Sequence, residues 1–229
     1  MINIKKYINI KNFIILILLF ILFYYSSLFK IFPMMIFNLS NKNPTDKIIL
    51  TAFSDCCLLL ILLFVFRKDI IKEFNIFKKD ILKNFDIGFS CWIIGLLFMV
   101  ISNVIISFIL KAGGAENEKL IQQMISKSPW FMIITAGVIA PIIEELIFRK
   151  GFKNSFNNKH LFIILSGLVF GLMHVISSNS LLEFLYIIPY SSLGISFAVA
   201  YYKTDTVFTP IIFHMIHNLI LIILAVFLH

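Results

Sequence analysis

The sequence predicts an all-α protein, a polytopic bundle of about seven transmembrane helices with one short interfacial helix. Composition is the first observation behind this prediction, because hydrophobic residues make up 60% of the 229 residues and charged residues only 14%. Water-soluble domains contain about 45–50% apolar and about 25% charged residues, so this chain carries more apolar surface than a soluble fold can bury. The second observation is that the apolar residues form runs close to the length of about 20 that crosses a bilayer.

The apolar runs account for the predicted helices, and the polar stretches between them connect these helices. The first run follows three lysines and is long for a signal peptide, so we expect a retained anchor helix. Residues 67–86 are predicted to be a charged cytoplasmic loop that is helical in part, and residues 115–128 an interfacial helix before Pro129. The predicted spans are residues 13–32, 48–66, 87–110, 130–148, 161–176, 184–201 and 207–228.

The net charge of +8 indicates membrane topology. The Lys and Arg residues lie between the apolar runs and form no single patch, so nucleic acid is not expected as a partner. Because basic residues gather on the cytoplasmic side, we expect a multi-pass plasma-membrane protein with a cytoplasmic N-terminus and an extracytoplasmic C-terminus. This orientation places 14 of the 20 basic residues inside; those outside are Lys30, Lys42, Lys47, Lys111, Lys119 and Lys127.

Two adjacent carboxylates, Glu144 and Glu145, interrupt the fourth apolar run, where a charged side chain costs roughly 2.5–3.5 kcal/mol. Arg149 lies one helical turn beyond Glu145 and is predicted to pair with it. Glu144 points about 100° away and has no partner in its own helix, so we expect it to face other helices or a water-filled cavity. Pro141 cannot donate an amide hydrogen bond and is expected to kink the helix just before Glu144.

Two later apolar runs contain the other polar residues whose insertion into a bilayer costs free energy. In residues 161–176, His174 is the one ionisable residue. The same run contains Gly167 and Gly171, whose four-residue spacing allows two helices to pack closely. In the last run His214 and Asn218 share one helical face, and His217 lies about 60° from His214 as a supporting candidate. Counted from the cytoplasmic helix ends at 1.5 Å per residue, these side chains and Glu144 fall at similar membrane depths. Three helices are therefore predicted to direct polar groups at one site.

These three segments together resemble the CAAX-protease and bacteriocin-processing family of intramembrane proteases, which includes the type II CAAX prenyl endopeptidases. The family pattern is E-E-x-x-x-R on one helix, F-x-x-x-H on a second and H-x-x-x-N or D on a third. This chain supplies Glu144-Glu145 with Arg149, Phe170 with His174, and His214 with Asn218. The resemblance covers about residues 130–225, so residues 126–229 are interpreted as catalytic helices and residues 1–125 as generic membrane helices of the same domain. Lys150 departs from the pattern, because many members have Gly directly after the Arg.

The resemblance implies peptide-bond hydrolysis within or beside the membrane. Glu144 and His174 would activate water, and His214 and Asn218 would stabilise the oxyanion. Glu145, Arg149, Phe170 and His217 would support them. A metalloprotease reading stays open, in which Glu144, His174 and His214 bind zinc with water as the fourth ligand. No H-E-x-x-H is present, and a metal-free reaction is favoured.

The expected partners are the lipid bilayer and a hydrophobic peptide or membrane-protein substrate, processed at a CAAX-type site or as a bacteriocin or leader peptide. Two other functions are kept. The resemblance also includes proposed non-catalytic roles in bacteriocin immunity or regulation. A proton-coupled transporter is a further alternative, because intramembrane Glu and His residues also build proton relays. The absence of a repeat between the two halves argues against the transporter.

Overall fold

The computed structural model describes residues 6–110, 116–176, 178 and 180–227, which form helices and no named β-strand. The N-terminal half contains α1 (Ile10–Tyr24), the 3-10 helix η2 (Ser26–Lys30), α2 (Ile31–Phe37), α3 (Pro44–Lys79), α4 (Ile81–Leu110) and α5 (Glu116–Lys127). The C-terminal half contains α6 (Pro129–Ile134), η3 (Thr135–Ile139), α7 (Ala140–Glu144), η4 (Glu145–Gly151), α8 (Phe152–Ser155), α9 (Lys159–Val175), η5 (Leu181–Tyr186), α10 (Ile187–Thr204) and α11 (Phe208–Phe227). The predicted all-α fold is confirmed.

Within the described residues, five helices are long and apolar enough to cross a membrane, and a sixth span exists if the bent pair Ile10–Tyr24 and Ser26–Phe37 is counted as one. This pair bends by 51°. The predicted 161–176 span forms α9, which has 17 residues and is therefore about 26 Å long, slightly shorter than a full span. The predicted number of seven spans is thus not confirmed, although the multi-pass bundle is.

The predicted cytoplasmic loop at residues 67–86 is almost entirely helical. α3 continues for 36 residues to Lys79, and α4 begins at Ile81 after a single break at Asp80. The interfacial helix predicted at residues 115–128 is present as α5, a strongly amphipathic helix. Lys111 and Ala115, used in the predictions above, lie outside the described residues.

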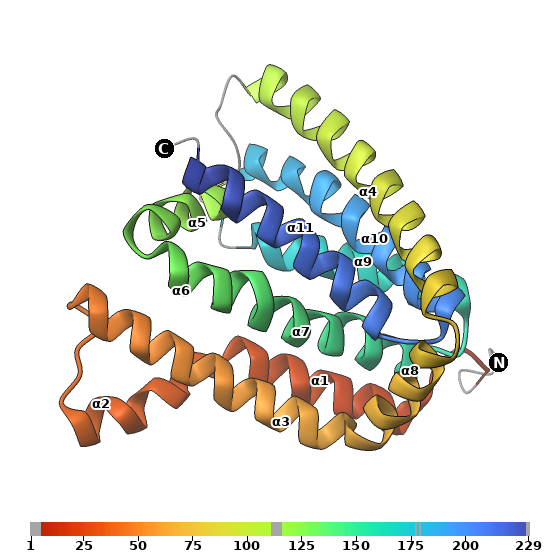
Figure 1. Ribbon diagram of the computed structural model, residues 1–229, viewed down its shortest axis with the longest axis horizontal. Helices are drawn as coiled ribbons and strands as arrows, with labels where there is room; N and C mark the ends of the chain where they lie inside the picture. The colour runs from red at the N-terminus through yellow and green to blue at the C-terminus, as the bar shows by residue number, and fades with distance from the viewer. Residues whose placement is uncertain (1–5, 111–115, 177, 179, 228–229) are drawn as a thin grey trace.

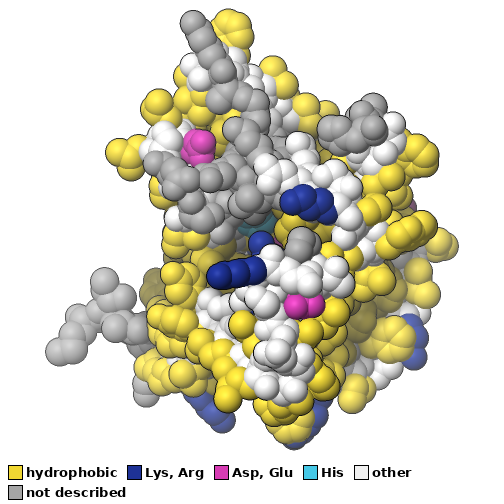
Figure 2. All heavy atoms as spheres, turned by 90° about the vertical axis from the view of Figure 1, so that its left-hand side faces the viewer, with side chains coloured by type: hydrophobic (Ala, Val, Ile, Leu, Met, Phe, Trp, Pro, Cys, Tyr) yellow, Lys and Arg dark blue, Asp and Glu magenta, His cyan; other side chains and the backbone are white. Residues whose placement is uncertain are grey.

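The segment that carries Glu144 runs through the middle of the bundle. Pro129–Ser155 lies with α1 and α3 on one side and α9, α10 and α11 on the other, while α4 covers α10 from outside (Figure 1). α9 and α10 approach closely because Gly167 and Gly171 face Ile195 and Ser191 without a side chain between them. Large hydrophobic side chains are exposed on most of the helices, as a bilayer requires, and many of them surround the face seen in Figure 2.

Candidate active site

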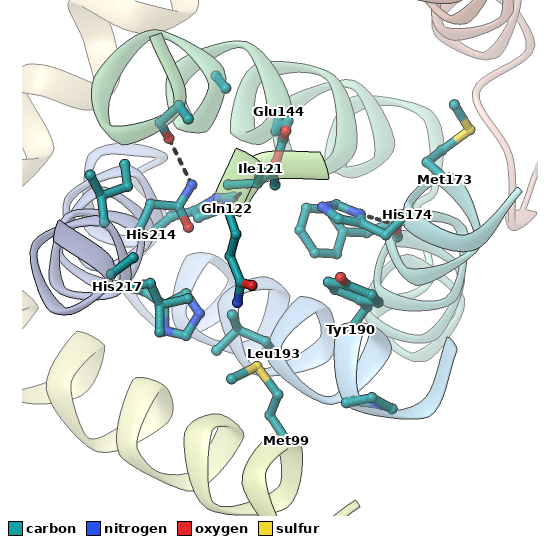
Figure 3. A pocket seen from close by; sticks show the side chains of 18 of the residues that line it. Met99, Ile121, Gln122, Glu144, Met173, His174, Tyr190, Leu193, His214 and His217 are labelled. Carbon is teal, nitrogen blue, oxygen red and sulfur yellow. Dashed lines mark hydrogen bonds and ion pairs between the residues drawn. The ribbon is translucent and has the colours of Figure 1, made fainter. Parts of the chain in front are cut away.

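The three predicted polar segments meet at one cavity of about 500 Å³. Glu144, His174 and His214 extend toward the same space from α7, α9 and α11 (Figure 3). The wall is otherwise mostly apolar and includes residues of α4, α5 and α10. The polar residues that line the cavity are Asn103, Gln122, Glu144, His174, Tyr190, His214, His217 and Asn218. The structure therefore brings together all four residues predicted to be catalytic.

His214 lies between the two adjacent carboxylates. Its Nε2 atom is 3.6 Å from Oε2 of Glu144, and its Nδ1 atom is 2.9 Å from Oε1 of Glu145. The two carboxylates differ in environment, because the Glu144 side chain is 18% exposed and the Glu145 side chain 0%. Glu144 can thus meet a substrate in the cavity, whereas Glu145 is confined to its protein partners.

Glu145 and Arg149 form the predicted ion pair, with 2.9 Å between Oε2 and Nε and both side chains fully buried. The guanidinium also donates from Nη1 to Oγ of Ser166 at 3.0 Å and lies over the ring of Phe170, 4.7 Å from its centroid. Phe170 in turn packs against the rings of His174 and His214 at centroid distances of 4.5 and 5.7 Å. These contacts link the buried ion pair to the histidines of the cavity.

The hydrogen bond between His174 and the Phe170 backbone determines which of the two ring nitrogens carries the proton. Nδ1 lies 2.9 Å from the carbonyl oxygen of Phe170, which can only accept, so Nδ1 carries the proton in the neutral ring. Nε2 is then left with a lone pair. Tyr190 stacks on the imidazole with 4.5 Å between ring centroids and holds its plane. No hydrogen bond joins His174 to Glu144 among the contacts of the described residues, although both side chains line the cavity.

Asn218 is anchored by a backbone group of the helix opposite. Its Nδ2 atom donates to the carbonyl oxygen of Ala136 at 2.8 Å, and one further N–H remains for the cavity. Ala136 belongs to η3, a π-helix, and a second π-helix, η4, follows Glu144. Pro141 is the second residue after η3 and lacks an amide proton, so the break predicted at this proline takes the form of a wide π-turn.

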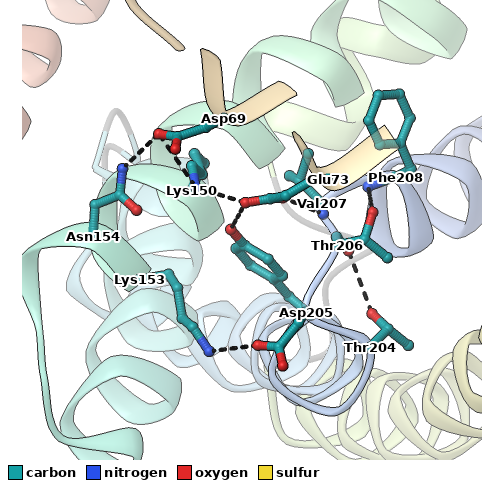
Figure 4. Close-up of polar contacts among 11 residues, drawn as sticks. Asp69, Glu73, Lys150, Lys153, Asn154, Thr204, Asp205, Thr206, Val207 and Phe208 are labelled. Atoms are coloured by element: carbon teal, nitrogen blue, oxygen red, sulfur yellow. Dashed lines mark hydrogen bonds and ion pairs between the residues drawn. The ribbon is translucent and has the colours of Figure 1, made fainter. Parts of the chain in front are cut away.

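Lys150 takes part in a polar cluster at the other end of the bundle, where the N-terminus lies (Figures 1 and 4). The buried ammonium pairs with Glu73 and, at 3.4 Å, with Asp69 of α3. Glu73 also accepts hydrogen bonds of 2.8 Å from the Tyr201 hydroxyl and the Val207 amide. This cluster ties α3 to the helix of Glu144 and closes that end. None of its residues lines the cavity.

Sequence reasoning missed part of the cavity wall. Gln122, Tyr190 and Asn103 of the wall are not singled out by the sequence motifs, nor is Trp92, which contacts His217. Asn103 carried a usable signal as an isolated amide in an apolar run, and Gln122 lay on the predicted interfacial helix. Trp92 and Tyr190 look like ordinary membrane aromatics in the sequence.

The residues proposed as zinc ligands line the same cavity but do not form a three-donor group. Within the described ranges, no three or more His, Cys, Asp or Glu side chains are arranged to hold a metal ion. Glu144 and His214 approach each other, whereas no hydrogen bond or ion pair of the described residues joins His174 to either of them. The residues present therefore do not fit a zinc site in this geometry.

Comparison with known proteins gives one domain match and several relatives. Residues 126–220 match the family model described as type II CAAX prenyl endopeptidase Rce1-like. The putative membrane peptidase YdiL of Bacillus subtilis is 27% identical over 93% of this chain and 89% of its own length. The membrane-embedded CAAX protease MroQ of Staphylococcus aureus is 30% identical over 55% of this chain and 53% of its own length. No solved structure matches the chain significantly.

Proposed function

Because residues 126–220 match the Rce1-like model of type II CAAX prenyl endopeptidases, we propose that this membrane protein is a protease of that family, which hydrolyses a peptide bond inside the cavity with a water molecule activated by Glu144 and His174. The observation that carries the proposal is the convergence of Glu144, His174, His214 and Asn218 on one cavity from separate helices. Polar residues that served only to pack the helices together would not need to line the same cavity.

In the proposed reaction, water binds between the Glu144 carboxylate and the free Nε2 lone pair of His174. Its oxygen attacks the carbonyl carbon of the scissile bond while its proton passes to Glu144. The carbonyl oxygen becomes negatively charged and is stabilised by the remaining N–H of Asn218 and by Nε2–H of His214, which is present when both ring nitrogens carry a proton. The carbon–nitrogen bond then breaks, and Glu144 returns the proton to the leaving amine. No step uses a metal ion.

Glu145 and Arg149 support this chemistry without meeting the substrate. Glu145 forms an ion pair with Arg149 and a hydrogen bond with His214, so it fixes the imidazole that faces Glu144. Both partners are fully buried, and an ion pair of this kind holds its geometry only while both members are present. We therefore assign them to positioning of His214.

The proposed substrate is a hydrophobic peptide or a membrane-protein segment. The cavity wall is formed largely by Ile, Leu, Met and Phe side chains, and Glu144 is the only carboxylate among the described residues that line it. CAAX-type tails, bacteriocins and leader peptides share this chemistry. The distribution of Lys and Arg along the sequence supports a cytoplasmic N-terminus, so the cavity would be reached from the opposite end of the bundle, where α5 lies (Figure 1).

The test is a substrate trap in the native membrane. Glu144→Gln is expected to keep the fold and to retain uncleaved substrate, which mass spectrometry of the purified variant would identify. The wild-type protein, purified in detergent, should then cleave a peptide copied from that substrate while Glu144→Gln does not. Equal cleavage by both proteins would refute the proposed base. Retention of the same partner without cleavage by either would instead support an immunity or regulatory role.

A further inference from the structure

His217 occupies a different environment from His214, although both belong to α11. It is buried, lines the cavity and is directed into it beside Leu193 and Gln122 (Figure 3). Its Nδ1 atom lies 3.4 Å from the indole Nε1 of Trp92 on α4, which donates the hydrogen bond. The contact joins α11 to a helix outside the matched domain.

Trp92 restricts His217 to one protonation form. An indole N–H can only donate, so Nδ1 of His217 must be the unprotonated nitrogen. In the neutral ring the proton then resides on Nε2. A protonated imidazolium would place two N–H donors face to face across this contact, which opposes the charged form.

The indole itself is held rigidly. Trp92 is buried and packs against Phe213 and Phe89 at ring-centroid distances of 6.1 and 6.0 Å. Phe213 immediately precedes His214, so the same aromatic cluster supports the start of the polar face of α11. Trp92 therefore presents its N–H in a fixed direction, which is the condition for fixing a tautomer.

The Nε2–H of His217 is a donor that the protein does not use. Within the described part of the chain, no hydrogen bond is made by this atom, and it is not a fully buried unsatisfied group. The other candidate donors are partly engaged, because His214 faces two carboxylates and Asn218 donates to Ala136. A donor set in advance and aimed into a largely apolar cavity is the arrangement that stabilises developing negative charge.

We propose that His217 is a further catalytic residue, whose Nε2–H donates a hydrogen bond to the carbonyl oxygen of the scissile peptide as it becomes an oxyanion. Trp92 is its positioning residue. The inference rests on the proposed function, since it assigns a role within the same hydrolysis. It gives the chain an oxyanion donor beyond His214 and Asn218.

The kinetic test separates the donor from its packing. His217→Phe keeps an aromatic ring but removes the donor, and is expected to lower kcat by about 10²–10³-fold with little change in KM. His217→Gln keeps an N–H and should recover part of kcat. The double variant Trp92→Phe/His217→Phe removes both buried polar partners, so it should regain thermal stability but not kcat. His160→Ala, an exposed histidine at the opposite end, is the control.

The decisive part of a spectroscopic test uses the wild-type protein and therefore needs no variant that folds. In ¹⁵N-histidine-labelled wild-type protein, NMR should show His217 as the Nε2–H tautomer, and Trp92→Phe should yield a mixture of tautomers. An Nδ1–H tautomer in the wild type would overturn the inference. So would full kcat in folded His217→Phe while Glu144→Gln is inactive, a result that leaves the proposed function intact. Failure of the wild type to cleave would instead refute the proposed function.

Discussion

Nδ1 of His214 lies 2.9 Å from Oε1 of Glu145, a residue 69 positions earlier in the chain. The second oxygen of the same carboxylate lies 2.9 Å from Nε of Arg149. Glu145 therefore serves two partners, one within its own helix segment and one across the bundle. The neighbouring Glu144 reaches His214 only loosely, at 3.6 Å, and remains open to the cavity. Of the two adjacent carboxylates, Glu145 thus holds its protein partners, while Glu144 is the one available to a substrate.

Glu144→Gln and Glu145→Gln should separate these roles. Glu144→Gln removes the proposed base and is expected to lower kcat by about 10²–10⁴-fold with an unchanged unfolding temperature. Glu145→Gln should lower both kcat and the unfolding temperature, because a neutral amide cannot form the ion pair with Arg149 while it also accepts from His214. Peptide cleavage and thermal unfolding in detergent measure the two effects. A stable, inactive Glu145→Gln protein would instead place Glu145 in the catalytic set.

Arg149→Ala should destabilise the protein by about 3–5 kcal/mol, because it leaves the fully buried Glu145 without its ion-pair partner. The measurement is reversible unfolding in mixed detergent. Arg67→Ala is the matched control, since Arg67 is exposed and should change stability by less than about 0.5 kcal/mol. Equal stability of the two variants would show that the pair contributes little to folding.

Gly171→Ala should destabilise the α9–α10 contact by about 1–3 kcal/mol. An added Cβ would lie 2.9 Å from both the Ile187 carbonyl oxygen and the Ser191 amide nitrogen, which are backbone atoms that cannot move aside. Gly151→Ala provides the comparison, because its Cβ would meet the flexible end of Leu16 at 2.8 Å. Folded yield and unfolding temperature should fall for the first variant and stay close to wild type for the second.

The buried Lys150–Glu73 pair should show a strong mutual dependence in a double-mutant cycle. Lys150→Met and Glu73→Gln, singly and together, are expected to give a coupling free energy of about 0.5–3 kcal/mol. The exposed Lys153–Asp205 pair, 3.2 Å apart, should give at most about 1 kcal/mol. Additive effects at Lys150 and Glu73 would show that the two side chains contribute independently.

Peptide cleavage should survive exhaustive chelation, because the proposed water activation needs only Glu144 and His174. The assay compares purified protein before and after chelator treatment, with metal content determined by mass spectrometry. Loss of activity together with loss of stoichiometric zinc, and recovery on adding zinc back, would contradict this prediction. The site would then have to rearrange, since no three donors among the described residues are arranged to hold a metal ion.

The parts of the site that are local in sequence could be predicted. The Glu145–Arg149 pair follows from helical spacing, and the convergence of the polar segments follows from the cost of leaving them in lipid. Contacts between distant residues could not be predicted. Sequence spacing says nothing of His214 facing Glu145, or of Trp92 facing His217, because these depend on how the helices rotate against one another.

The errors in the fold have identifiable causes. Residues 67–86 were predicted as a loop from their charge, yet no Gly or Pro occurs between Thr45 and Ile87, and Lys and Glu are good helix formers. Conversely, the first span breaks after Tyr24, where neither Gly nor Pro marks the bend. The sequence shows Lys150 only as a departure from the family pattern, because its buried partner Glu73 lies 77 residues away.

The two π-helices that flank α7 also affect how the gene can vary in length. A π-turn holds one residue more than an α-turn, so deleting a single codon within Thr135–Ile139 can be absorbed by a return to α-helix. The same deletion inside an ordinary α-helix would rotate every later side chain by about 100°. The helix of Glu144 therefore contains a position where an in-frame loss need not turn its carboxylate away from the cavity. The consequence would fall on Asn218, whose acceptor is the Ala136 carbonyl in that turn.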